Sequence, residues 1–147
     1  MSQAATAPAN DAGQGRAPVK LVVANKENTP FVPGRRVFFK YRDLGVADAT
    51  QGRMRAQVMS AISGMTEPTG WHIHECEAQF VYVLRGWVEL EFEDGTRTRS
   101  GPGDAILIPG GMKHNEIATS DDVEILEVSV PGPMATKPCD PPAGMRG

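Results

Sequence analysis

Between residues 35 and 130 the chain divides into short segments of alternating apolar and polar residues, separated by turns rich in glycine and proline. In one such segment Phe39 and Tyr41 alternate with charged neighbours, which is typical of a strand with one buried face. Asp94-Gly95 separates two further segments and is a strong signal for a tight hairpin. Short strands at regular spacing predict an all-β fold, either an antiparallel sandwich or a barrel. The jelly roll, a double-stranded β-helix, is the form expected for a chain of this size.

The expected strands follow from this alternation. If Gln79 faces the interior, Val81 and Val83 face it too and form apolar walls, since side chains two apart on a strand share a face. A single helical turn is expected near residues 46–49. The strands are expected at residues 37–42, 54–62, 71–75, 79–84, 87–93, 96–99, 105–108, 114–119 and 123–130.

At 147 residues the chain fits one domain that can bury a core without disulfides. Residues 1–18 are rich in Ala, Gln, Gly and Pro without periodicity, and we expect a disordered or draped arm. Residues 19–130 are expected to form the barrel. Residues 131–147 are dense in Pro and Gly and predict an extended, irregular tail.

The overall charge and the cysteine content exclude several classes of partner. A formal net charge of -3 argues against nucleic acid or an anionic membrane as the main partner. The first residues contain no apolar signal segment, and no stretch is long enough to span a membrane. We therefore expect a cytoplasmic protein in which Cys76 and Cys139 are reduced.

All three histidines of the chain stand where one metal site would need them. His72 and His74 are two residues apart on an expected strand, so both imidazoles point the same way. His114 lies forty residues further on, just after the turn Pro109-Gly110-Gly111. A third imidazole from a neighbouring strand would complete a facial set for a divalent transition metal.

The histidines belong to two longer patterns. The first runs His72-x-His74, four residues, Gln79, six residues, Gly86. The second runs Gly103, five residues, Pro109-Gly110-Gly111, two residues, His114. Together they resemble the two motifs of the cupin superfamily, small β-barrels of jelly-roll topology, and within it the small single-domain, metal-binding conserved-barrel cupin type 2 proteins. The resemblance covers about residues 35–130.

Three positions depart from the family pattern. Thr66 stands at the position of the first glycine, Ala118 replaces a final asparagine, and Gln79 replaces the usual glutamate. The resemblance implies His72, His74 and His114 as metal ligands, with Gln79 as a fourth through its side-chain oxygen. Gln79 as a non-ligand that hydrogen-bonds a histidine is the alternative.

The glutamine has an electrostatic consequence. Three imidazoles and an amide are neutral, so a divalent ion would keep its full charge, which favours an anionic substrate and disfavours a ferric state. We expect one divalent transition metal per chain, with iron favoured and zinc, nickel or manganese as alternatives.

Four further residues are candidates for a role in the site. Arg55 and Gln57 can orient an anionic substrate if their face of the strand looks inward, although a solvated or interface arginine is the simpler interpretation. Glu127 can serve as a partner of a ligand or as a proton acceptor, and an exposed edge charge is the alternative. Cys76 shares parity with the histidines, but a buried, inert thiol is the better interpretation.

The resemblance implies a small-molecule enzyme, such as an Fe(II)-dependent dioxygenase of a dicarbonyl or aromatic chelating substrate. A metal-dependent isomerase or lyase and a non-catalytic module that binds or senses a small ligand are the alternatives. Because family members are often homodimers, the outward aromatics Phe38, Phe80 and Tyr82 and the N-terminal arm lead us to expect a homodimer.

Overall fold

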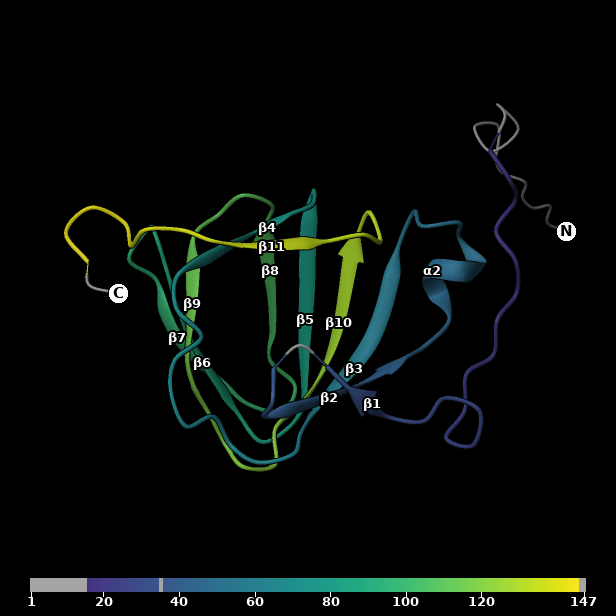
Figure 1. The fold of residues 1–147 in the computed structure, drawn as a ribbon, viewed down its shortest axis with the longest axis horizontal. Coiled ribbons are helices and arrows are strands. Elements are labelled where there is room, and N and C mark those ends of the chain that lie inside the picture. The colour runs from purple at the N-terminus through teal and green to yellow at the C-terminus, as the bar shows by residue number, and fades with distance from the viewer. Residues whose placement is uncertain (1–15, 35, 146–147) are drawn as a thin grey trace, which may run out of the picture.

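The computed structural model describes residues 16–34 and 36–145, and these residues form two antiparallel β-sheets (Figure 1). This architecture confirms the predicted all-β jelly-roll fold. Residues 1–15 of the predicted arm lie outside the described residues. The first sheet has the spatial order β1 (Val32–Pro33), β2 (Phe39–Asp43), β3 (Arg55–Ala61), β10 (Glu124–Val130), β5 (Ala78–Arg85) and β8 (Ala105–Pro109). The second has the order β11 (Ala135–Pro138), β4 (His72–Glu75), β9 (His114–Thr119), β6 (Val88–Phe92) and β7 (Arg97–Ser100).

The core lies between the two sheets. On β5 the side chains of Gln79, Val81 and Val83 are buried while those between them are exposed, which confirms the predicted parity of this strand. Burial of such alternating apolar side chains is the main force that holds the two sheets together. The fully buried core comprises Phe39, Met59, Val81, Val83, Ile108 and Ile125 of the first sheet, Val88, Leu90 and Phe92 of the second, and Val123 before β10.

The register of three central strands arranges the inward side chains in rows. Arg55 of β3 and Gln79 of β5 both pair with Ser129 of β10, which forms one row. The next row joins Gln57, Glu127 and Val81. A third row, Met59, Ile125 and Val83, is entirely apolar. The inward face of this sheet therefore grades from polar at one end to apolar at the other.

The helical turn α2 (Val46–Ala49) occupies the predicted position. It packs against β3, and Ala49 is buried, as are Ala56 and Val58 of β3. Both faces of β3 are therefore covered. The sequence left open which face of this strand looks inward because neither face is fully polar.

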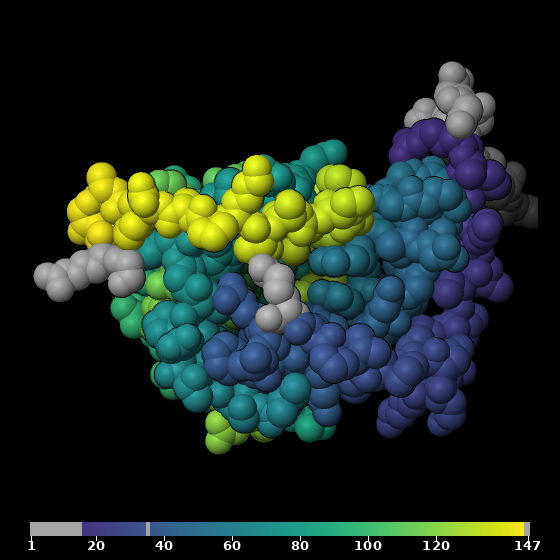
Figure 2. All heavy atoms as spheres, in the orientation of Figure 1, coloured from purple at the N-terminus to yellow at the C-terminus, as the bar shows by residue number. Residues whose placement is uncertain are grey.

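Two expectations about the ends of the strands need correction. The predicted irregular tail contains a strand, since β11 pairs with β4 along its whole length and crosses one end of the sandwich (Figure 1). Figure 2 shows the C-terminal segment, in yellow, running across this end of the molecule. Phe38 is not an outward aromatic, because it packs against the core at the start of β2, whereas Phe80 and Tyr82 are exposed. Among the described residues, no helix is long and apolar enough to cross a membrane.

Candidate metal centre and pocket

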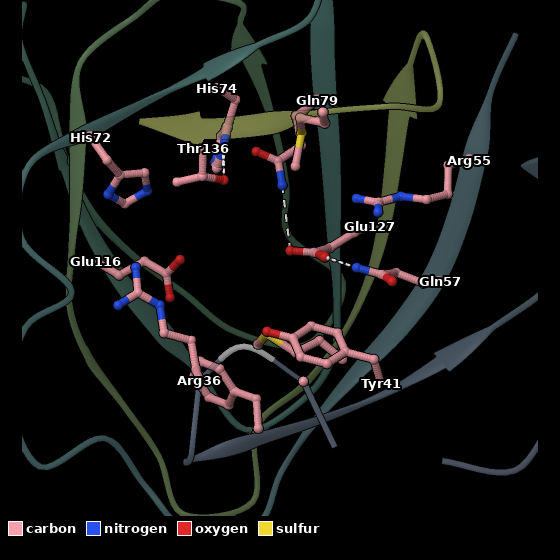
Figure 3. Close-up of a pocket in the computed structure, with 14 residues that line it drawn as sticks. Arg36, Tyr41, Arg55, Gln57, His72, His74, Gln79, Glu116, Glu127 and Thr136 are labelled. Carbon is pink, nitrogen blue, oxygen red and sulfur yellow. Dashed lines mark hydrogen bonds between the residues drawn. The ribbon is translucent and has the colours of Figure 1, made fainter. Parts of the chain in front are cut away.

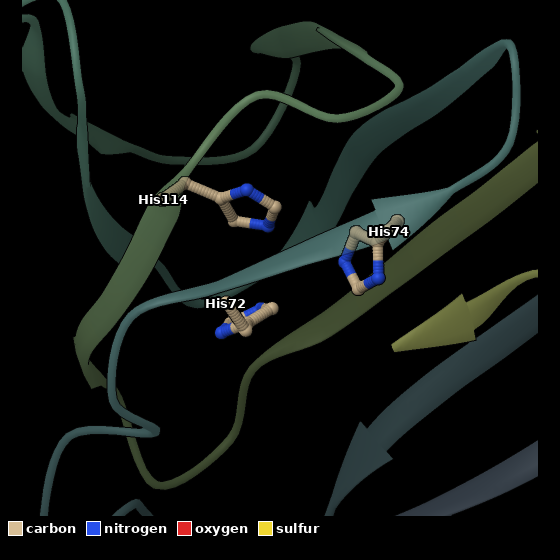
Figure 4. Close-up of side chains that lie close together, drawn as sticks. All are labelled: His72, His74 and His114. Atoms are coloured by element: carbon tan, nitrogen blue, oxygen red, sulfur yellow. The ribbon is translucent and has the colours of Figure 1, made fainter. Parts of the chain in front are cut away.

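Three buried imidazoles converge at one point between β4 and β9 (Figure 4). His72 and His74 lie on the same face of β4, and His72 is paired directly with His114, the first residue of β9. The potential ligand atoms of all three rings lie within 4.8 Å of one another. The structure thus brings together the three histidines that the sequence singled out.

The turn before β9 positions His114. The backbone N–H of Gly110 donates to the carbonyl of Glu77, and that of Gly111 donates to the carbonyl of His74, both at 3.0 Å. A Cβ atom on Gly110 would lie 1.6 Å from the carbonyl oxygen of Cys76. Gly111 has φ +80, a conformation that favours glycine. The two glycines allow this turn to dock on the end of β4, which places His114 beside the other two rings.

Hydrogen bonds to Nδ1 set the orientation of the rings. Nδ1 of His72 donates to the carbonyl of Gly70 at 2.7 Å, and Nδ1 of His114 donates to the carbonyl of Met112 at 2.9 Å. Because a carbonyl can only accept, the neutral rings of these two histidines keep a lone pair on Nε2. Burial lowers the pKa of His114 and is only partly opposed by the Met112 carbonyl, which favours the neutral, metal-binding form.

His74 has a different partner. Its Nδ1 lies 3.0 Å from the hydroxyl of Thr136, which belongs to β11. A hydroxyl can donate or accept, so it accepts from Nδ1 in the tautomer that leaves Nε2 open. The C-terminal strand therefore supplies a support for one of the three histidines.

Gln79 places an amide beside the histidines. Its side chain is 4% exposed, and its Nε2 donates to Oε2 of Glu127 at 3.4 Å. Its Oε1 is buried without a hydrogen-bond partner among the described residues. Figure 3 shows this oxygen on the side of His74 and the amide nitrogen on the side of Glu127. Burying an amide oxygen without a partner costs free energy unless a bound ligand interacts with it. Three imidazole nitrogens and this oxygen are a donor set that fits a divalent transition metal.

A cavity of about 320 Å³ opens beside the centre. Three of the four further candidates, Arg55, Gln57 and Glu127, line it (Figure 3). Of the two faces of β3 that the sequence left open, the one that carries Arg55 and Gln57 is therefore the one that looks into the cavity. The full lining is Gly34, Arg36, Phe39, Tyr41, Arg55, Gln57, Met59, His72, His74, Gln79, Glu116, Glu127, Met134 and Thr136.

Glu127 is an interior acid and not an exposed edge charge. It lies on β10, in the middle of the first sheet, with Oε1 accepting from Nε2 of Gln57 at 2.8 Å. Burial raises the pKa of Glu127, and the hydrogen bond from Gln57 and the charge of Arg55 oppose this effect. A buried carboxyl whose pKa is shifted toward neutrality is typical of proton-transfer groups.

Several residues that line the cavity were not predicted from the sequence. Parity could have found Tyr41, two residues from the core residue Phe39, and Glu116, two residues from His114. Alternation put Arg36 on the face opposite Phe39 and Tyr41, and Thr136 lies in a Pro- and Gly-rich tail without alternation, so no sequence signal pointed to either residue. Cys76 lies between β4 and β5, outside the histidine cluster, and burial followed by the charge of Glu77 raises the pKa of its thiol.

These features define the class of the molecule as a two-sheet jelly roll with a three-histidine metal-type site at its open end. Residues 62–129 match the model of the cupin domain family. Similar solved structures include the polyketide cyclase RemF from Streptomyces resistomycificus, which is 22% identical, with 80% of this chain and 84% of that chain covered and a TM-score of 0.65.

Two further solved structures are similar to this chain in fold. KdgF from Halomonas sp. is 22% identical, with 74% of this chain and 92% of that chain covered and a TM-score of 0.61. An RmlC-like cupin from Shewanella frigidimarina is 17% identical, with 74% of this chain and 89% of that chain covered and a TM-score of 0.58. A search of curated protein sequences gave no match. Residues 62–129 thus resemble the cupin domain in sequence, and the similar solved structures share the fold of this chain.

Proposed function

We propose that this chain is a metal-dependent enzyme that acts on a small, anionic, metal-chelating molecule. The observation that carries the proposal is the partnerless oxygen of Gln79, which faces three converging imidazoles while the same amide holds Glu127. These contacts support a metal site and an acid-base group that would lie side by side in one cavity.

His72, His74 and His114 would hold the metal, with Gln79 as a fourth ligand. All four donors are neutral, so a divalent ion would keep its charge and attract an anion. When bound, the ion would act as a Lewis acid that polarises the oxygens of a chelating substrate. Fe(II) is the favoured ion, with Zn(II), Ni(II) and Mn(II) as alternatives.

Glu127 is the proposed proton acceptor. Gln57 and Gln79 donate to its two carboxyl oxygens, which fixes its orientation at the cavity wall. From this position it can take a proton from the carbon next to a polarised carbonyl, leaving an enolate. The apolar side chains of Phe39 and Met59 line the same cavity and exclude water from the reacting carbon.

Enolisation would serve two reaction classes. If the enolate reacts with dioxygen, the protein is a dioxygenase-like oxidoreductase, which is the function that we favour with iron. If the enolate is reprotonated or loses a group, the protein is an isomerase or a lyase. A protein that binds such molecules without turnover would be a sensing or sequestering module.

The test separates these outcomes. The Zn(II)-loaded protein is incubated in D2O with α-ketovalerate, and exchange of the C3 protons is followed by NMR. We expect exchange above the rate with free Zn(II), and we expect its loss in Glu127→Gln at unchanged metal content. Exchange that persists in Glu127→Gln would rule out Glu127 as the base. Oxygen uptake by the Fe(II)-loaded protein with β-diketones and catechols then distinguishes the oxygenase, and saturable binding without exchange or uptake would leave the binding module.

A further inference from the structure

Arg55 lines the cavity, yet the protein does not satisfy its charge. By contrast, Arg42 and Arg97, which lie outside the cavity, have partners in Thr29 and Glu89. Among the described residues, the guanidinium of Arg55 makes no hydrogen bond and no ion pair, and only its charge acts on Glu127. A guanidinium carries five N–H donors in a planar fork that matches a carboxylate. A guanidinium in a cavity with unused donors is suited to bind an anion.

The position of Arg55 puts this fork within the cavity. Figure 3 shows the side chain extending from β3 toward Gln79 and Glu127. Glu127 already accepts hydrogen bonds from Gln57 and Gln79, so the donors of Arg55 remain for a ligand. Arg36 adds a second positive charge on the other side of the cavity in this view, next to Glu116.

The register gives the span between the two ends of the cavity. Arg55 and Gln79 pair with the same residue of β10, so their Cα atoms lie two strand spacings apart, about 10 Å. Both side chains point inward from these positions. A short-chain acid can therefore reach from the metal, beside Gln79, to the guanidinium of Arg55.

We propose that Arg55 forms a carboxylate subsite, and that the substrate is a short bifunctional acid whose α-keto or α-hydroxy acid head chelates the metal while a second carboxylate binds Arg55. This inference rests on the proposed function, because it takes the metal centre as the site of the head group. It narrows the substrate class from any small chelating anion to one with a second, distal carboxylate. Arg55 then selects the substrate and sets the direction in which it enters.

The test uses two matched pairs of acids: α-ketoglutarate with α-ketovalerate, and α-ketoadipate with α-ketocaproate. In each pair the head is identical and a distal carboxylate is replaced by a methyl group. Binding to the Co(II)-loaded protein is followed by the visible spectrum of Co(II), which reports chelation by the head. A charge-assisted bidentate contact predicts that one or both dicarboxylates bind about 10- to 100-fold more tightly than their partners.

Arg55→Gln should remove this preference while leaving the affinity for Co(II) unchanged, and it should weaken binding of α-ketovalerate, which has no distal carboxylate, far less than binding of α-ketoglutarate. Arg85→Gln, an exposed arginine at the end of β5, is the control for net charge and should keep the preference. Equal binding of both members of each pair, with the Co(II) spectrum changed by both, would overturn the subsite and leave the proposed function intact. Loss of the preference in Arg85→Gln to the same extent would also overturn it. A Co(II) spectrum that no acid changes would overturn the proposed chelation and the subsite with it.

Discussion

The hydroxyl of Thr136 offers the sharpest test of how the fold supports the metal centre. Thr136→Val removes the hydrogen bond to Nδ1 of His74 but keeps the shape and β-propensity of the side chain. His74 is buried, so its Nδ1–H would lose this partner in the tautomer that binds metal. The loss of such a hydrogen bond by a buried group costs about 1–3 kcal/mol, which agrees with the 10- to 100-fold loss of metal affinity that is typical when a ligand loses its supporting partner.

The assay is competition calorimetry of Ni(II) or Zn(II) binding to wild type, Thr136→Val and Thr136→Ser. We expect Thr136→Ser to bind as wild type does, because it keeps the hydroxyl, and Thr136→Val to bind about 10- to 100-fold more weakly. Thermal unfolding of the metal-free proteins checks that β11 remains docked. Wild-type affinity in Thr136→Val, or an equal loss in both variants, would refute the supporting role of this hydrogen bond.

Three further predictions follow from the structure. Gly110→Ala should lower the free energy of unfolding, measured with denaturant, by more than about 3 kcal/mol, because the added Cβ meets a backbone carbonyl. Gly95→Ala is the control: its added Cβ meets nothing, so it should cost only about 1 kcal/mol for its positive φ. Equal costs in the two variants would contradict the docking of the turn. Because the pKa of Glu127 is raised in the folded state, the unfolded chain loses the Glu127 proton at a lower pH than the folded chain does. The free energy of unfolding of the metal-free protein should therefore fall as pH rises from the ordinary glutamate pKa to the raised one. Glu127→Gln should lack this pH dependence, and a pH dependence of equal size in both proteins would mean that another group causes it. We expect a homodimer that covers two exposed apolar side chains, Leu21, which follows the predicted arm and is 91% exposed, and Leu107 on the edge strand β8. Analytical ultracentrifugation should show dissociation in Leu21→Asp, and a wild-type monomer at all concentrations would contradict this expectation.

The strands and the histidine cluster were predictable because both follow from a period of two. Alternation on β5 placed Gln79, Val81 and Val83 on one face, and the same rule aligned His72 with His74. The glycine turn before His114 marked the return of the chain to the site. Local rules sufficed because these residues lie on strands whose neighbours enforce the alternation.

Local patterns left alternatives open for Arg55 and Glu127 and gave no signal for Thr136, because the role of each depends on remote pairing. Glu127 lies on a central strand only because β10 inserts between β3 and β5, which no local pattern reveals. Arg55 faces the cavity because α2 covers the opposite face of β3. Thr136 supports His74 because the tail adds to the second sheet, and a Pro- and Gly-rich tail carries no periodicity that predicts a strand.

The central claim is that the three histidines bind one metal ion per chain. The direct measurement is the metal content of protein purified without a metal-chelating tag, by elemental mass spectrometry, beside His74→Ala. We predict about one equivalent of a divalent transition metal, with iron favoured, and its loss in His74→Ala. Absence of bound metal from the wild type, persisting after reconstitution with Fe(II), Ni(II) and Zn(II), would contradict the claim and leave a metal-free ligand-binding barrel.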